Sequence, residues 1–72
     1  MNKQKLESIM KLHSDTGGTL AKTLGIARST FSAKINETNG AEFTQSEIAT
    51  IKDRYKLSAN EVDEIFFELK VS

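Results

Sequence analysis

Residues 16–36 constrain this chain more than any other stretch, because they carry two short helical patterns joined by a tight turn. Ala21 is small enough for a second helix to cross close to the first. Gly25 can adopt the left-handed conformation that ends a helix, without the steric penalty that a Cβ would bring. The stretch therefore predicts a helix, a glycine turn and a second helix, the arrangement called a helix-turn-helix. Its predicted anchoring residues are Leu20, Leu24, Ile26, Phe31 and Ile35.

One face of the second predicted helix stays polar when Phe31 and Ile35 turn toward the core. In a DNA-binding helix-turn-helix, that face enters the major groove and reads base edges. A guanidinium group at its start suits guanine, and nearby hydroxyl and ammonium groups suit the phosphate backbone. The alternative is a pair of helices that binds nothing. The candidate groove-facing residues are Arg28, Ser29, Ser32, Ala33 and Asn36, and the candidate phosphate contacts are Thr16, Lys22 and Lys34.

Three features weaken the case for independent DNA binding. Ala27 stands at the N-cap position of the second helix, where a serine or asparagine would normally satisfy a free backbone N–H. Gly17 and Gly18 follow the predicted N-cap Thr16 and leave no long polar side chain to hold a phosphate early in the first helix of the pair. Ten basic and ten acidic residues also give the chain no net charge, whereas a DNA-binding domain is usually basic.

The charges are nevertheless segregated along the chain. Residues 1–34 hold six basic and two acidic side chains, a net charge of +4. Residues 35–72 hold four basic and eight acidic side chains, a net charge of −4. One half could face phosphate and the other a basic protein. The alternative is a set of solvated helix faces without a partner.

Three further helices are predicted around this pair, which makes residues 1–72 a single all-α domain. The first covers residues 2–13, and a loop at 37–43 returns Phe43 to the core. Capping boxes at 44–47 and 58–61 begin the fourth and fifth helices. Adjacent helical residues cannot both point into the core, so Phe66 or Phe67 is expected at an edge or in an interface. The predicted inward-facing residues are Leu6, Ile9 and Met10 with Leu12 or His13, then Ile48, Ile51 and Tyr55, then Val62, Ile65, Phe66 and Leu69.

Several kinds of chemistry find no support in the sequence. Cysteine is absent, so disulfides and thiolate metal sites are excluded. There is no phosphate loop and no cluster of metal-ligand residue types, so no metal and no cofactor is expected. The neighbours His13, Ser14 and Asp15 do not make a catalytic triad, because a triad is a spatial arrangement, and enzymatic activity is not expected. No apolar run approaches the ~18 residues of a membrane span, so the expected location is the cytoplasm.

The segments LAKTLGIARSTFSAKIN, EFTQSEIATI and LSANEVDEIFF resemble the Cro/CI-type helix-turn-helix family of temperate phages. The similarity covers about residues 4–69, and its most specific part is LA-x-x-LGI-x-RSTFS. The resemblance implies a compact five-helix, lambda-repressor-like bundle. It also implies operator DNA bound through the third helix, at the stripe from Arg28 to Asn36.

Within this family the chain resembles the antirepressors of temperate phages, the modulators of repression. That similarity implies an antirepressor that binds the DNA-binding domain of the phage CI repressor and keeps it off its operators, with joint action on operator DNA at other sites. A protein that covers a basic recognition helix needs acidic groups, and the hypothesis assigns this role to Glu42 and Glu47, flanking Arg28, Ser29 and Ser32. The alternative is a Cro-like repressor that binds operator DNA directly through its third helix.

Overall fold

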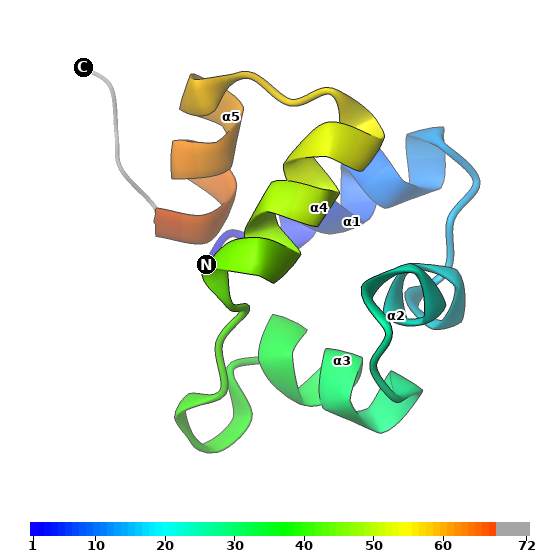
Figure 1. Cartoon of the computed structure of the whole chain (residues 1–72). Helices are drawn as coiled ribbons and strands as arrows, with labels where there is room; N and C mark the ends of the chain where they lie inside the picture. The colour runs from blue at the N-terminus through cyan, green and yellow to red at the C-terminus, as the bar shows by residue number, and fades with distance from the viewer. Residues whose placement is uncertain (68–72) are drawn as a thin grey trace.

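The computed structural model describes residues 1–67, and every regular element within that range is helical (Figure 1). A short 3-10 turn, η1 (Thr38–Gly40), follows α3 (Arg28–Ile35), and a π-helical segment, η2 (Asp63–Phe67), continues α5 (Ala59–Val62). The predicted all-α fold of five helices is confirmed, while the lambda-repressor-like topology stays a prediction, and Leu69 lies outside the described residues. The elements are α1 (Lys3–Leu12), α2 (Gly17–Leu24), α3 (Arg28–Ile35), η1 (Thr38–Gly40), α4 (Gln45–Tyr55), α5 (Ala59–Val62) and η2 (Asp63–Phe67).

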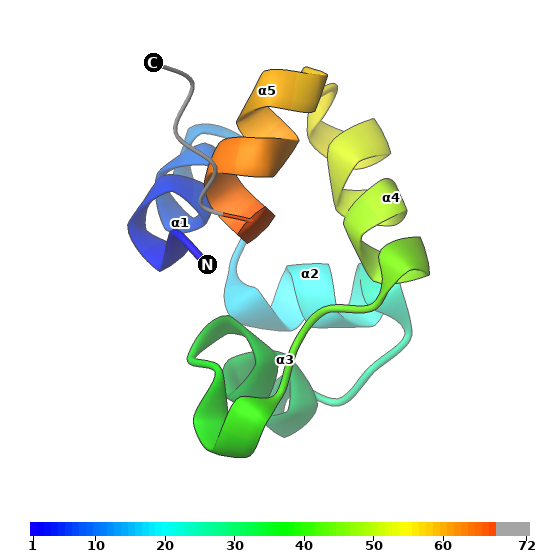
Figure 2. The same ribbon diagram turned by 90° about the vertical axis from the view of Figure 1, so that its left-hand side faces the viewer.

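The helices divide into two groups around one core. Figure 2 shows α2 and α3 together at one end of the molecule, with α1, α4 and α5 at the other. Four side chains with no more than traces of exposed surface come from four different elements: Leu6 of α1, Leu20 of α2, Ile51 of α4 and Ile65 of η2. Burial of this apolar surface stabilises the packing at about 25 cal/mol per Å². The interior therefore joins both groups of helices.

Side-chain caps define where the helices begin. The Asn2 side chain accepts a hydrogen bond from the Lys5 backbone N–H, and Thr16 accepts one from that of Thr19. Both predicted capping boxes are present, at the starts of α4 and α5. As predicted, Ala27 gives α3 no side-chain cap. Capping bonds of this kind contribute about 1 kcal/mol each, so the start of α3 is the weakest of these helix starts.

The end of α1 differs from the sequence prediction. Leu12 follows Met10 by two residues, which is roughly 200° around a helix, so it points away from the core and is 83% exposed. His13 is the C-cap of α1 and is also exposed, but its ring lies against that of Tyr55, with the ring centroids 4.9 Å apart. Neither residue therefore joins the buried stripe, which consists of Leu6 and Met10 with partly buried Ile9.

Candidate functional site

The connection between α2 and α3 has the compact geometry expected for this stretch. Gly25 ends α2 with φ 73° and ψ 28°, the left-handed conformation that favours glycine. The backbone N–H of Ile26 donates to the carbonyl of Ala21 at 3.0 Å, which closes the turn. Ala21 is only 2% exposed, consistent with a close helix crossing at a small side chain. The predicted helix, turn and helix are thus present, and the use of this unit to bind DNA stays a prediction.

The predicted polar stripe of α3 lies at the surface. Arg28, Ser29 and Ser32 are exposed, whereas Ala33 is half-buried. Asn36 is the exposed C-cap of α3, and its amide nitrogen donates to the Ser32 carbonyl at 2.9 Å. Its amide oxygen accepts a bond from Lys3 of α1 at 2.6 Å. The stripe therefore ends in a side chain that is already held by internal bonds.

Arg28 is the cationic group of this stripe. Its guanidinium lies against the first turn of α2, where a Cβ added to Gly18 would come within 2.7 Å of Nη2. Among residues 1–67 it has no ion-pair or hydrogen-bond partner. The absence of a side chain at Gly18 thus makes room for an unneutralised guanidinium on the surface of the α2–α3 pair.

The three predicted phosphate contacts have different environments. The Thr16 hydroxyl is the N-cap of α2 and is also within 3.1 Å of the Thr19 hydroxyl. Lys22 is exposed and has no partner within the described part of the chain. The ammonium of Lys34 donates to Glu47 Oε1 at 2.5 Å, and its side chain is only 16% exposed. Lys34 as a phosphate contact stays a prediction, and it requires the ion pair with Glu47 to open.

Glu47 is not the exposed acidic group that the sequence suggested. Its carboxylate accepts bonds from Lys34 and, at 2.8 Å, from the Thr44 backbone N–H, and its side chain is 11% exposed. Burial raises the pKa of Glu47, but the bonds from Lys34 and Thr44 outweigh burial and the net shift is downward. Its role is to cap α4 and pair with α3. Glu42, in contrast, is exposed and has no partner within residues 1–67.

A second polar cluster, which the sequence reading missed, joins the α1–α2 loop to α4. Arg54 donates to both carboxylate oxygens of Asp15, at 2.8 and 2.9 Å, and the Tyr55 hydroxyl donates to Oδ2 at 2.6 Å. These bonds from Arg54 and Tyr55 lower the pKa of Asp15 to about 2. Burial and the bond to Asp15 raise the pKa of Tyr55 to about 12. At neutral pH Asp15 and Arg54 therefore stay charged and Tyr55 stays neutral, so the cluster suits a structural role that holds the α1–α2 loop against α4.

Ion pairs connect the basic and acidic halves of the chain. Lys5 pairs with Glu64, Lys34 with Glu47, and Asp15 with Arg54. The Met1 amine also pairs with Glu37 at 2.5 Å. Lys5–Glu64 and Lys34–Glu47 each join a basic side chain of the first half to an acidic side chain of the second, so part of the charge segregation is used within the fold.

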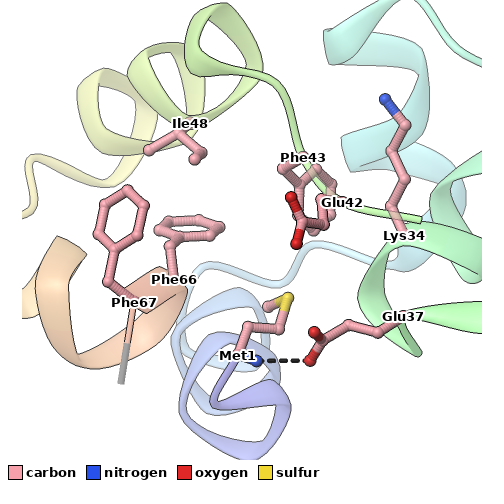
Figure 3. Close-up of a pocket in the computed structure, with 8 residues that line it drawn as sticks. All are labelled: Met1, Lys34, Glu37, Glu42, Phe43, Ile48, Phe66 and Phe67. Atoms are coloured by element: carbon pink, nitrogen blue, oxygen red, sulfur yellow. Dashed lines mark hydrogen bonds and ion pairs between the residues drawn. The ribbon is translucent and has the colours of Figure 1, made fainter. Parts of the chain in front are cut away.

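An aromatic hollow of about 110 Å³ lies beside the C-terminal end of α3 (Figure 3). Phe31, Phe43 and Phe66 form a chain of edge-to-face contacts, with ring centroids 5.7 and 5.9 Å apart. Phe67 is 46% exposed, as expected for one of the two adjacent phenylalanines. We call this feature the aromatic hollow. Its apolar lining is Phe43, Ile48, Phe66 and Phe67, and Met1, Lys34, Glu37 and Glu42 complete it.

The π-helical segment η2 carries Phe66 and Phe67, two of the three phenylalanines that line the hollow. Its i→i+5 hydrogen bonds give a wider turn than an α-helix, which changes the directions in which successive side chains leave the backbone. Phe66 packs on Phe43, while Phe67 stays at the surface, and both line the hollow. Short π segments often occur at functional sites. No sequence signal used above predicted this segment.

The polar stripe and the aromatic hollow meet where α3 ends. Asn36 ends the stripe, and the next residue, Glu37, lines the hollow. Within residues 1–67 there is no group of three or more His, Cys, Asp or Glu residues placed to hold a metal ion. In the same range, none of the helices has the length and apolar character needed to cross a membrane. Two exposed features of the described residues therefore lie next to each other: the polar stripe of α3 and the aromatic hollow.

Comparisons with protein-family models, with curated proteins and with solved structures find no match.

Proposed function

We propose that this chain is an antirepressor of a temperate phage, acting in the bacterial cytoplasm on the lytic–lysogenic switch. Its partner is the DNA-binding domain of the phage CI repressor, whose recognition helix it covers so that the repressor cannot hold its operator. The observation that carries the proposal is the state of the charges on α3. Lys34 is neutralised by Glu47, so Arg28 is the cation of α3 that has no partner among residues 1–67.

This arrangement suits a protein surface better than a phosphate backbone. Affinity for DNA grows with the number of phosphates that Lys and Arg neutralise, and each contact adds to the salt dependence of binding. Arg28 and Lys22 are exposed cations of the α2–α3 pair without a partner in the described part of the chain, whereas Lys34 is paired with Glu47. The hydroxyl groups of Ser29 and Ser32 and the carboxylate of Glu42 suit the hydrogen-bonding and cationic groups of a repressor's recognition helix.

A Cro-like repressor that binds operator DNA directly is the second candidate. The exposed stripe of α3 and the free guanidinium of Arg28 favour it, because bidentate contact between Arg and guanine is a common specific contact in the major groove. The two candidates differ in what they require of Arg28. Direct DNA reading needs it to face a base, whereas antirepression needs only a surface that fits the repressor.

Calorimetric titration of the chain into the purified CI DNA-binding domain, without DNA, tests the proposal. We expect saturable binding with one chain per repressor domain. Ser32→Arg places a bulky cation at an exposed point of the stripe, opposite the basic recognition helix of the repressor, and is expected to weaken the complex, whereas Thr50→Arg on the exposed side of α4 is the control. No heat of binding with the repressor, combined with steeply salt-dependent binding to operator DNA, would favour the Cro-like alternative.

A further inference from the structure

We propose that the aromatic hollow receives one arginine side chain from the recognition helix of the repressor. The guanidinium group bonds to Glu42, and the aliphatic stem lies against Phe67. This inference rests on the proposed function, because it names the contact by which the repressor is held. The acidic residue that contacts the repressor is then Glu42, at the hollow beside the end of α3, and not Glu47.

The size of the hollow favours a single side chain as its occupant. Its volume is about 110 Å³. Sites for small molecules and cofactors are usually about 300–1,000 Å³, so a ligand of that kind would be held poorly. A side chain presented by another protein needs less enclosure, because the rest of the partner contributes the remaining contacts.

The charges around the hollow favour a cationic occupant. Lys34 donates to Glu47, and Figure 3 shows its amino group directed away from the hollow. The Met1 amine is bonded to Glu37. Glu42 has no ion-pair partner within residues 1–67, and Figure 3 shows its carboxylate directed toward the hollow. Among the charges of residues 1–67 that line the hollow, the carboxylate of Glu42 therefore remains unpaired beside an apolar surface.

The aromatic groups favour arginine over lysine. Phe67 exposes nearly half of its surface next to Phe66. A guanidinium is planar, stacks on aromatic faces and binds a carboxylate through two parallel hydrogen bonds. An ammonium is more strongly hydrated and gains less from the aromatic surface. A basic recognition helix is a natural source of such a side chain, because arginine is its most frequent specific contact with guanine.

The test uses two variants of the hollow and two matched controls. Glu42→Arg reverses the unpaired charge, and Phe67→Ser removes the exposed ring. Asp53→Arg makes the same charge change at an exposed site on α4. Leu12→Ser removes an exposed apolar side chain at the C-terminal end of α1, whereas the hollow lies beside Met1 at the other end of that helix. Affinity for the purified CI DNA-binding domain is measured by calorimetry. Circular dichroism checks that each of the four variants keeps the helix content of the wild type.

We expect Glu42→Arg and Phe67→Ser each to weaken binding by at least about tenfold, and the two controls to change it by less than about threefold. Changing the engaged repressor arginine to glutamate should restore part of the affinity for Glu42→Arg but not for Asp53→Arg. If Ser32→Arg abolishes binding while both hollow variants bind like the wild type, the proposed function stands and the role of the hollow is refuted. If the wild type does not bind the repressor, both proposals fail. Sedimentation that shows self-association lost in Phe67→Ser would assign the hollow to a second copy of this chain.

Discussion

Replacing Glu47 with alanine should destabilise the fold, although the sequence suggested a surface residue. The change removes the acceptor for the Thr44 backbone N–H at the start of α4. It also leaves the ammonium of Lys34, on a side chain only 16% exposed, without its counterion. Loss of the capping bond costs about 1 kcal/mol, and the unpaired, largely buried cation costs at least as much again.

The expected loss in the free energy of unfolding is therefore about 2 kcal/mol. A chain of this length has a total stability of roughly 4–11 kcal/mol, so the loss is a large fraction of the whole. For a domain of this size, it lowers Tm by roughly 8–16 °C. Thermal unfolding at pH 7, followed by circular dichroism, measures this shift.

The capping box of α5 supplies a matched control. Glu61 accepts a bond from the Ser58 backbone N–H at 2.9 Å, but it has no ion pair within residues 1–67. Glu61→Ala should therefore lower Tm by less than half as much as Glu47→Ala. Adding Lys34→Met to Glu47→Ala should recover part of the loss, because the unpaired charge is then removed. Equal shifts for the two alanine variants, with no recovery by Lys34→Met, would refute the reasoning.

Three further predictions concern stability. The pKa of Asp15 falls from 3.8 to about 2 on folding, so its contribution is present above pH 3.8 and is lost as the pH falls toward 2. Solvent screens the pair because Arg54 is one-third exposed, so Asp15→Asn should lower the free energy of unfolding by about 1 kcal/mol at pH 7. Urea unfolding should show that the difference between variant and wild type vanishes near pH 2. Gly18→Ala should raise Tm by roughly 2–4 °C, because only the flexible end of Arg28 must move, and an unchanged or lower Tm would show that this end is held in place. Gly25→Ala meets no neighbouring atom but must adopt φ 73°, so it should cost about 1 kcal/mol in urea unfolding, and a neutral effect would contradict the strain argument.

The sequence predicted those parts of the structure that depend on near neighbours along the chain. Each capping box involves side chains three residues apart, and Gly25 ends α2 through its own backbone conformation. Helical spacing also separated the buried Phe31 and Ile35 from the exposed residues of α3. These signals are local, so no knowledge of the tertiary structure is needed to interpret them.

The sequence could not predict contacts between distant segments. Lys34 and Glu47 are 13 residues apart, and each was expected on the surface from its charge alone. Asp15 and Arg54 are 39 residues apart, and their bidentate pair depends on how the α1–α2 loop meets α4. The aromatic hollow requires the π-helical turn at residues 63–67 as well as the return of the loop after α3. These features follow from packing rather than from local pattern.

A gel-shift titration on the phage operator region tests the central claim most directly. It compares the purified chain alone, the CI repressor alone, and the two together. If the chain is an antirepressor, it gives no specific shift alone, and increasing amounts of it remove the repressor from the operator. Specific retardation by the chain alone at submicromolar concentration, with the repressor still bound when both are present, would contradict antirepression.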